Sequence, residues 1–365
     1  MSSRLWGLDR RQTIVVFTLV VVVGIVIGLL LGPAGRNEDP APRGDGTARI
    51  DPGSPGSARA VWAFGFETLR FGPALGLHGR LPVQGYGAVQ GAAGRVDLYD
   101  PASGRTGVLT STTNRLRSAG RVPAGVAPTA PFAPLIATTA THRWLVPRPG
   151  VVLRVGRFSA PDHATVPVAG EVAGPVASAV ATAGRAVYAA TAGSAGITVA
   201  RVDAATAKVG SSGQVAVAGP FTLDGLTADR AAVWVLVGGT AYALDPESLT
   251  VTRRVTVTGR GPGEVRGLVA AGGGVFTLAD NGASLVRVDG TTPVVVLRIL
   301  PEALPTFRLP ASLTASGRRV YALVPRTATV DDRRTRLAGY DVGRGRPTPA
   351  VDLPSGLFAG AVAAT

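Results

Sequence analysis

Residues 231–255, AAVWVLVGGTAYALDPESLTVTRRV, decide the fold of this chain. They contain three short runs rich in apolar and β-branched residues, which favour β-strands. Gly238 and Gly239 separate the first two runs, and the turn sequence DPES, beginning at Asp245, separates the second from the third. Gly tolerates a positive φ, and Asp accepts hydrogen bonds from the backbone that follows it. The stretch therefore predicts consecutive antiparallel strands joined by tight turns.

The same pattern recurs along most of the chain. The aromatic residue of the second strand returns at intervals of 44, 46, 42 and 45 residues from Trp144 onward. A short apolar strand precedes each aromatic, and a strand ending in a turn, usually with Asp, follows it. A repeat of about 45 residues that contains four short strands is typical of a β-propeller blade. The aromatics, which we expect to pack between neighbouring blades, are Trp62, Trp144, Tyr188, Trp234, Phe276 and Tyr321, with Tyr86 as a weaker seventh member.

The two ends of the repeat region complement each other. Residues 356–365, GLFAGAVAAT, resemble a first strand with no second strand after it, and residues 58–63 resemble a second strand with no first. Pairing them in one blade would close the ring and remove its edges. The sequence thus predicts an all-β, seven-bladed propeller over 58–365. Six blades is the alternative, because the 24 residues between Trp62 and Tyr86 are too few for a blade.

The units, best seen in 231–255, resemble the YVTN and PQQ-like superfamily of β-propeller repeats. This resemblance covers roughly 58–365 and implies an architecture rather than an activity, because the superfamily includes surface-layer and binding proteins as well as quinoprotein enzymes. Quinoprotein dehydrogenases often hold a vicinal Cys pair against the quinone, and this chain has no Cys. The resemblance therefore implies no PQQ, no other cofactor and no catalytic residue here.

Residues 13–32, TIVVFTLVVVVGIVIGLLLG, are typical of a single transmembrane helix, because they form an uncharged apolar run long enough to cross a bilayer. Basic residues precede the run and mixed charges follow it. The positive-inside rule therefore predicts a cytoplasmic N-terminus over 1–12 and a propeller outside the membrane of a bacterial cell. A cleaved signal peptide is the alternative, but its apolar region would be shorter and would end at a small-x-small site.

Two further features follow from this N-terminal region. Gly24, Gly28 and Gly32 lie four residues apart, so they share one helix face on which a second helix can approach closely. This spacing indicates a homodimer through the anchor, although Gly is also common in membrane helices generally. Residues 33–57 are rich in Pro, Gly, Asp and Arg and lack the apolar content to fold, so we expect a disordered linker.

Composition limits the partners and the chemistry. The formal net charge is +14, and Lys208 is the only lysine among 37 basic residues. A positive field outside the membrane favours anionic partners such as lipid headgroups or acidic wall polymers, whereas nucleic acid is not expected there. A solvated basic surface is the alternative. Without Cys, disulfides and thiolate metal sites are excluded. The three histidines, His78, His142 and His163, lack metal-ligand spacing, so no metal is predicted.

Propellers usually bind ligands on loops between blades and between the second and third strands. We expect these loops over 117–132, 257–264, 280–283, 299–309 and 325–335, with the whole segment 114–132 a long connection. Loops carry function disproportionately, although a charged loop is also an ordinary solvated surface. The candidate binding residues are Arg260, Glu264, Asp280, Asn281, Asp331, Asp332, Arg333 and Arg334.

These observations predict a noncatalytic binding or scaffold module for an envelope protein or a wall polymer. The alternative is a hydrolase or lyase that uses acidic residues, with or without a divalent metal, at the central channel. Convergent Asp and Glu at the channel would favour the enzyme, and a channel lined by Ala, Val and Gly would favour the binding module. A small-ligand sensor would need a membrane partner, because twelve cytoplasmic residues leave no room for an output domain.

Overall fold

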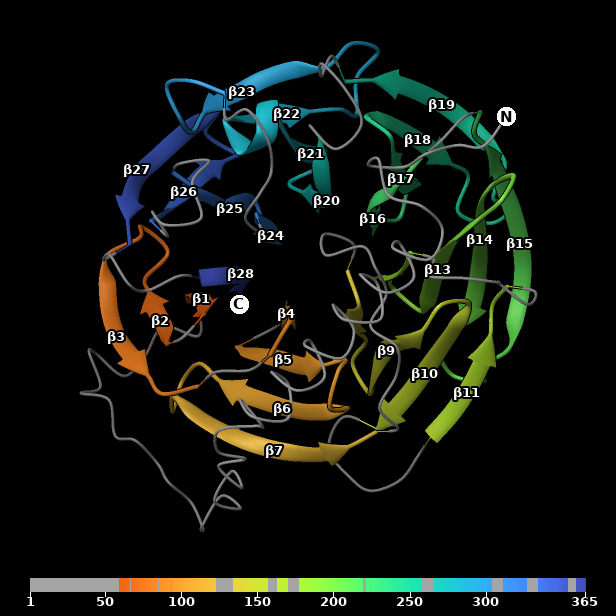
Figure 1. The fold of residues 1–365 in the computed structure, drawn as a ribbon, viewed down its shortest axis with the longest axis horizontal. Coiled ribbons are helices and arrows are strands. Elements are labelled where there is room, and N and C mark those ends of the chain that lie inside the picture. Colours follow the sequence, from red (N-terminus) through yellow and green to blue (C-terminus); the bar gives the residue numbers. More distant parts are fainter. Residues whose placement is uncertain are drawn as a thin grey trace, which may run out of the picture. The chain divides into compact units, whose positions relative to one another are not determined.

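The computed structural model describes twelve segments that together span most of 59–365. They fold into seven four-stranded antiparallel sheets, the blades of a propeller, arranged around a central axis (Figure 1). The predicted all-β, seven-bladed fold is confirmed, and the six-bladed alternative is wrong. The described segments are 59–65, 67–83, 86–92, 94–122, 134–156, 163–169, 177–218, 221–257, 265–303, 311–326, 334–353 and 359–365.

Each blade is numbered here along the chain, and its strands are given from the axis outward. Blade 1 contains β28 (Ala359–Ala364), β1 (Val61–Gly65), β2 (Thr68–Phe71) and β3 (Leu77–Leu81). Blade 2 contains β4 (Ala88–Ala92), β5 (Arg95–Asp100), β6 (Arg105–Thr110) and β7 (Arg115–Arg121). Blade 3 contains β8 (Ile136–Thr138), β9 (His142–Arg148), β10 (Val151–Gly156) and β11 (His163–Pro167).

The other four blades follow the same order. Blade 4 contains β12 (Ser178–Ala183), β13 (Ala186–Gly193), β14 (Gly196–Asp203) and β15 (Val209–Ala216). Blade 5 contains β16 (Leu223–Ala228), β17 (Val233–Val237), β18 (Thr240–Leu244) and β19 (Val251–Thr256). Blade 6 contains β20 (Arg266–Ala271), β21 (Gly274–Ala279), the 3₁₀ turn η1 (Asp280–Gly282), β22 (Ser284–Arg287) and β23 (Val294–Arg298). Blade 7 contains β24 (Ser312–Ser316), β25 (Arg319–Pro325), β26 (Thr335–Asp341) and β27 (Arg346–Asp352).

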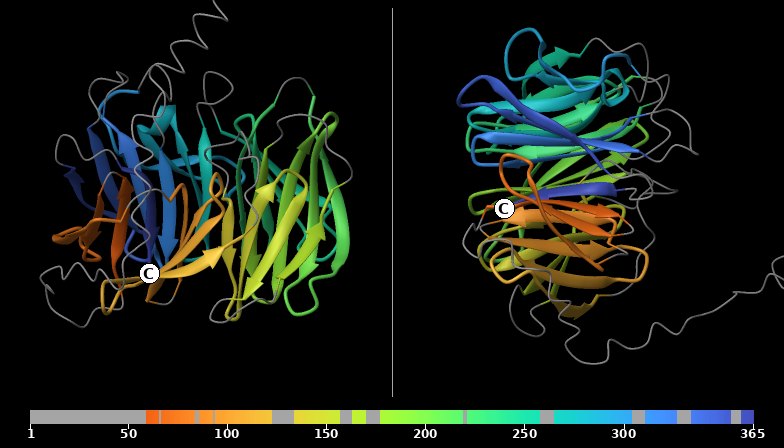
Figure 2. Two further views of the ribbon diagram at one scale, coloured as in Figure 1. Left: turned by 60° about the horizontal axis from the view of Figure 1, so that its bottom comes forward. Right: turned by 90° about the vertical axis from the view of Figure 1, so that its left-hand side faces the viewer.

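Position within a blade explains the composition of each strand. Both faces of a blade pack against neighbouring blades, as the stacked sheets in Figure 2 show, so a second strand is buried on both sides. A strand buried on both faces is a continuous apolar run rather than an alternating one, as in the fully buried VWVLV of β17. The outermost strand β7, RLRSAGR, is exposed at every residue and is correspondingly polar.

The first strands are built from small residues because the blades converge at the axis. A Cβ added at Gly91 of β4 would lie 1.8 Å from the carbonyl oxygen of Ala364 in β28. One added at Gly225 of β16 would lie 2.8 Å from the backbone nitrogen of Leu268 in β20. Neither contact is sterically allowed, so these positions require Gly for the close approach of adjacent blades.

The repeated aromatics pack between blades, as predicted. Trp62, Trp144, Tyr188, Trp234, Phe276 and Tyr321 all lie in second strands and are at most 4% exposed. Each belongs to a buried cluster that combines its own blade with the next one; Trp144 of blade 3, for example, packs with Val187 and Ala189 of blade 4. The aromatics are therefore core residues and not a ligand platform.

The seventh aromatic was assigned wrongly. Tyr86 precedes β4, so it lies before the first strand of blade 2 and not in its second strand. The second-strand position is occupied by Asp97, which pairs with Gln90 just as Tyr188 pairs with Ala181 in blade 4. Asp97 is 0% exposed, and Oγ1 of Thr138 in blade 3 donates to its carboxylate at 3.1 Å. At this position blade 2 meets blade 3 through a polar contact. The aromatic of its second strand is Tyr99, two residues further on, which is 0% exposed and belongs to the buried cluster shared by blades 2 and 3.

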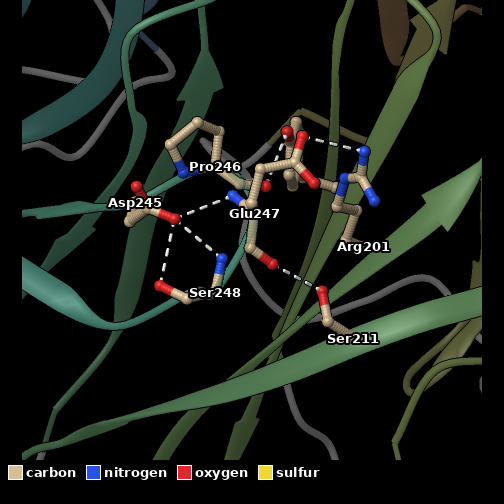
Figure 3. A network of polar contacts seen from close by, with 7 residues as sticks. Arg201, Ser211, Asp245, Pro246, Glu247 and Ser248 are labelled. Carbon is tan, nitrogen blue, oxygen red and sulfur yellow. Dashed lines mark hydrogen bonds and ion pairs between the residues drawn. The ribbon is translucent and has the colours of Figure 1, made fainter.

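Hydrogen bonds between one blade and a turn of the next blade supplement this packing. In Figure 3, Arg201 of blade 4 donates to the carboxylate of Glu247 in blade 5 at 3.0 Å, and Ser211 donates to the Glu247 carbonyl oxygen at 3.0 Å. The Tyr188 hydroxyl donates to the Pro246 carbonyl oxygen at 3.1 Å. The Asp245 carboxylate accepts hydrogen bonds from the backbone N–H groups of Glu247 and Ser248, so the DPES sequence forms the predicted tight turn.

The ring closes through strands from the two ends of the propeller, as predicted. β28 pairs antiparallel with β1, with Trp62 opposite Ala363 and Val61 opposite Ala364. The contact extends past the strand, because the Thr365 backbone nitrogen donates to the Ala60 carbonyl oxygen at 2.9 Å. Blade 1 is therefore assembled from segments about 300 residues apart in sequence.

Two predictions about the remaining segments have different outcomes. The segment 114–132 is not entirely a connection, because Arg115–Arg121 forms the outermost strand of blade 2. No helix long and apolar enough to span a membrane occurs among the described residues. The predicted anchor 13–32, including Gly24, Gly28 and Gly32, lies outside them and stays a prediction, as do the linker 33–57 and the cytoplasmic segment 1–12.

Candidate functional site

The connections between blades and the turns between second and third strands emerge at one end of the propeller, because consecutive strands are antiparallel. We call this end the loop face. The first-to-second and third-to-fourth strand connections lie at the opposite end, which we call the turn face. The predicted binding loops 280–283 and 325–335 both begin and end on the loop face, in blades 6 and 7.

The loop of blade 6 is held by an ion pair. Asp280 and Asn281 adopt left-handed backbone conformations, with φ of 53° and 54°, so the chain turns sharply between β21 and β22. The Asp280 carboxylate accepts hydrogen bonds from Ser284 Oγ at 2.6 Å and from Arg298 Nη1 at 3.1 Å. Arg298 also donates to Ser284 Oγ at 2.8 Å. Asp280 therefore braces the loop, while the Arg298 side chain remains 64% exposed.

The base of the 325–335 loop in blade 7 carries a second ion-pair group. Arg336 forms a bidentate contact with Asp352 at 2.7 and 3.1 Å, and Arg326 Nη1 lies 3.0 Å from the same carboxylate. The hydrogen bond from Arg336 lowers the pKa of Asp352 below its usual value, and the charges of Arg326 and Arg334 lower it further. One carboxylate is thus surrounded by three guanidinium groups, and this end of blade 7 carries a net positive charge.

These two groups form one structure, which we call the blade 6–7 network. Ile299, just after β23, donates its backbone N–H to the Ala283 carbonyl oxygen at 2.7 Å. Its own carbonyl oxygen accepts from Arg336 Nη1 at 3.2 Å. The network contains four arginines and two aspartates, so it can bind carboxylate or phosphate groups of a partner. Its charged members are Asp280, Arg298, Arg326, Arg334, Arg336 and Asp352.

The predicted site residues are only partly brought together. Asp280, Asn281 and Arg334 lie on the loop face, with Asp280 and Arg334 in the network and the Asn281 side chain buried. Arg298, Arg326, Arg336 and Asp352 were missed because they lie in strands or at strand ends. The sequence feature that could have identified two of them is the pairing of Arg336 with Asp352, which lie opposite each other in the β26–β27 hairpin. Outside the described residues are Arg260, Glu264, Asp331, Asp332 and Arg333.

A second feature of the loop face is a buried acid beside the channel. Asp224 lies at a bulge near the start of the innermost strand β16 and is 4% exposed. Its carboxylate accepts from Thr222 Oγ1 at 2.8 Å and from the Gly238 backbone N–H at 3.1 Å. Burial raises its pKa to about 6, although these hydrogen bonds and the charge of Arg266 oppose the rise. Asp224 is therefore an acid that titrates just below neutral pH.

Asp224 is expected to make stability pH-dependent in a defined direction. Its folded-state pKa lies above the unfolded value of 3.8, so its stabilising contribution is complete below pH 3.8 and is lost as pH rises through 6. At about 1.4 kcal/mol per pKa unit, the contribution is ~1–3 kcal/mol. Urea unfolding of the wild type and of Asp224→Asn between pH 4 and 7.5 measures it. On acidification, the free energy of unfolding of the wild type should rise by that amount relative to that of Asp224→Asn. A difference that does not change with pH would contradict a buried, titrating Asp224.

Charge is sparse along the innermost strands. Their sequences are AGAVAA, AVQGA, IAT, SAVATA, LDGLTA, RGLVAA and SLTAS, so the charged residues of these seven strands are Asp224 and Arg266. In the described part of the chain, no three His, Asp or Glu residues are grouped so that they could hold a metal ion. The described innermost strands thus lack the convergent acids that would have favoured a hydrolase or lyase.

The architecture is shared with solved propeller structures. A protein from Lactobacillus plantarum has a TM-score of 0.57 and 12% identity, with 84% of this chain and 99% of that chain covered. A putative 6-phosphogluconolactonase from Bacteroides uniformis has a TM-score of 0.56 and 12% identity, with 84% and 99% covered. Apo AztD from Citrobacter koseri has a TM-score of 0.55 and 8% identity, with 85% and 98% covered.

These likenesses establish the fold alone, because the sequence identities are so low. The chain matches no protein-family model and no curated protein. The resemblance to the YVTN and PQQ-like repeats stays a prediction at the level of the family. Among proteins of one propeller architecture, function depends on the site and not on the fold.

Proposed function

We propose that this protein is a noncatalytic binding or scaffold module, anchored in the bacterial cell membrane by residues 13–32 with its propeller outside. The observation that carries the proposal is the blade 6–7 network. It places exposed guanidinium groups on a braced part of the loop face, where propellers commonly bind. The partner we infer is an envelope protein or wall polymer that presents carboxylate or phosphate groups.

Preorganisation supports this function. Asp280 and Asp352 hold the arginines through ion pairs of 2.7 to 3.1 Å, so binding would order fewer side chains than on a free surface. Arg298 and Arg326 nevertheless keep 64% and 34% of their side-chain surface exposed, so a partner can reach them. A weakly hydrated, planar guanidinium suits bidentate recognition of carboxylate and phosphate.

The alternative function is a hydrolase or lyase. Asp224 favours it, because an acid with a pKa of about 6 can donate or accept a proton near neutral pH. Glycoside cleavage, however, usually requires a pair of carboxylates. The described innermost strands supply one carboxylate, and both oxygens of Asp224 already accept hydrogen bonds. The binding function therefore fits the described residues better.

Cross-linked capture of the tagged full-length protein from native membranes tests the proposal. The variant is Arg298→Ala with Arg326→Ala. The matched control is Arg115→Ala with Arg117→Ala, which removes the same charge from the exposed strand β7 of blade 2. A thermal unfolding scan of each protein shows that the fold is kept. We expect a stoichiometric partner that the control retains and the blade 6–7 variant loses.

Each other outcome overturns a part of the proposal. Equal capture by both variants would remove the network from the interface. A protein recovered alone would overturn the scaffold function and leave the enzyme alternative, to be followed by metal and substrate screening. Recovery in the soluble rather than the membrane fraction would overturn the anchor. Capture without cross-linked dimers would overturn self-association through Gly24, Gly28 and Gly32.

A further inference from the structure

A basic pocket lies on the turn face, at the seam between blades 7 and 1. Its volume is about 410 Å³, within the range of small-molecule sites. The β24–β25 and β26–β27 turns form its blade 7 side, and the ends of β28 and β1 form its blade 1 side. None of the sequence predictions included it. Its charged lining residues are Arg59, Arg318, Arg319, Arg344 and Asp341.

The floor of the pocket is fixed in place. Arg319 Nη1 donates to the Pro73 carbonyl oxygen of blade 1 at 3.0 Å, and its Nε lies 3.5 Å from the Asp341 carboxylate. The Tyr321 hydroxyl donates to the same Pro73 oxygen at 3.2 Å. The Asp341 carboxylate in turn accepts from the Arg344 backbone N–H at 3.1 Å. The two bonds to Pro73 cross the seam, so they tie the base of the pocket to both blades.

The rim carries exposed arginines. Arg318 and Arg344 lie in adjacent turns, and neither forms an ion pair with an acidic side chain of the described residues. Gly343 makes room for the Arg318 guanidinium, because a Cβ there would lie 2.5 Å from its Nε. The Gly residue thus lets the guanidinium lie flat against the backbone beside the pocket. Arg59 is exposed at the blade 1 side.

Charge and shape together indicate the class of ligand. Four arginines and one aspartate give the lining side chains a net charge of +3. Such a site favours an anion with more than one charge or with several acceptor oxygens, and the guanidinium fork matches phosphate geometry. The volume exceeds that of inorganic phosphate, and Ala60, Tyr321 and Ala364 add uncharged surface. We propose that this pocket binds the phosphate group of an organic phosphate ester, independently of the blade 6–7 network.

The location at the seam predicts a consequence for stability. A ligand held by Arg318, Arg344 and Arg59 contacts blade 7 and blade 1 together. Because it binds only when the ring is closed, it stabilises the folded state by an amount that grows with the ligand concentration. Phosphate-ester binding should therefore raise the unfolding temperature of the wild type.

The experiment uses the purified full-length chain in 0.15 M NaCl and follows binding by calorimetry and by the shift in unfolding temperature. The probes are glycerol 3-phosphate for a soluble ester and dihexanoyl phosphatidylglycerol for a lipid headgroup. Inorganic phosphate, succinate and dihexanoyl phosphatidylcholine are the comparison ligands. The variants are Arg318→Gln with Arg344→Gln, and Gly343→Val, which displaces Arg318 without removing charge. Arg115→Gln with Arg117→Gln on β7 is the control.

We expect either ester to bind, with affinity reduced about tenfold or more in both pocket variants and unchanged in the control. If only glycerol 3-phosphate binds, the ligand is a soluble ester. If the phosphatidylglycerol binds, whether or not glycerol 3-phosphate also binds, the ligand is a lipid headgroup. The proposal is overturned if neither ester binds, or if the control weakens binding as much as the pocket variants. The proposal is also overturned if succinate or inorganic phosphate binds as tightly as the ester. If only the phosphatidylglycerol binds, equal affinity for the phosphatidylcholine overturns it as well.

Discussion

Deleting residues 359–365 is expected to abolish cooperative folding of the propeller rather than to remove one strand from it. β28 is the innermost strand of blade 1, and Val362, Ala363 and Ala364 are at most 2% exposed. Without it, β1 presents an unpaired edge, and blades 7 and 2 lose apolar contacts at the seam. The loss is comparable with the net stability of a whole domain, ~5–15 kcal/mol. Urea unfolding followed by circular dichroism measures it.

The matched control keeps the strand but changes its place in the sequence. In this variant, residues 359–365 are moved in front of Arg59 and joined to it by a two-glycine turn, so the chain ends at Phe358, as the truncated chain does. Ala364 lies opposite Val61, so a tight hairpin can make this connection. We expect the rearranged chain to fold with a single transition, whereas the truncated chain aggregates or unfolds without one. A truncated chain with an unchanged urea midpoint would show that β28 does not close the ring.

Closure was predictable because each end of the repeat region lacks the strand that the other end supplies. The other first strands were predictable for a related reason. A first strand needs small residues at the crowded axis, and VASAVAT, FTLDGLTA and PASLTAS share that composition. These features depend on local sequence and on the repeat, so no knowledge of distant contacts was needed.

Blade 2 shows where this reasoning fails. The prediction identified second strands by their aromatic residue, and in blade 2 that position holds Asp97. The prediction chose Tyr86 instead of Tyr99, which lies in β5 two residues beyond Asp97, so it placed the second strand of blade 2 too early in the chain. A buried Asp is tolerated here because Thr138 of the next blade donates to it, which only the packed structure reveals.

The candidate site was predictable as a region but not as a set of residues. Propeller topology alone placed the 280–283 and 325–335 loops on one face. The pairing of Arg336 with Asp352 requires the strand register, and the raised pKa of Asp224 requires its burial. The seam pocket joins Arg59 to residues more than 250 positions away, so a scan for local motifs could not detect it.

Replacing Trp144 with Ala is expected to destabilise the propeller strongly. Trp144 is 0% exposed and packs between blades 3 and 4 against Val180, Val187 and Val202. Removing a buried indole leaves a cavity, because β-strands held in a closed ring cannot collapse around it. The cost is about 3–5 kcal/mol, measured by urea unfolding at pH 7. A cost below ~1 kcal/mol would contradict its role between the blades.

Replacing Trp144 with Phe separates the ring's packing from its N–H group. The indole Nε1 of Trp144 is buried with no hydrogen-bond acceptor among the described residues, whereas Nε1 of Trp62 donates to Ser111 Oγ at 3.3 Å. A buried unsatisfied donor costs about 1–3 kcal/mol, so losing it offsets part of the lost packing. We therefore expect Trp144→Phe to stay within ~1 kcal/mol of the wild type and Trp62→Phe to cost more, since Ser111 loses its donor. Equal costs for the two Phe variants would mean that the Trp144 N–H is satisfied, so that its burial carries no penalty.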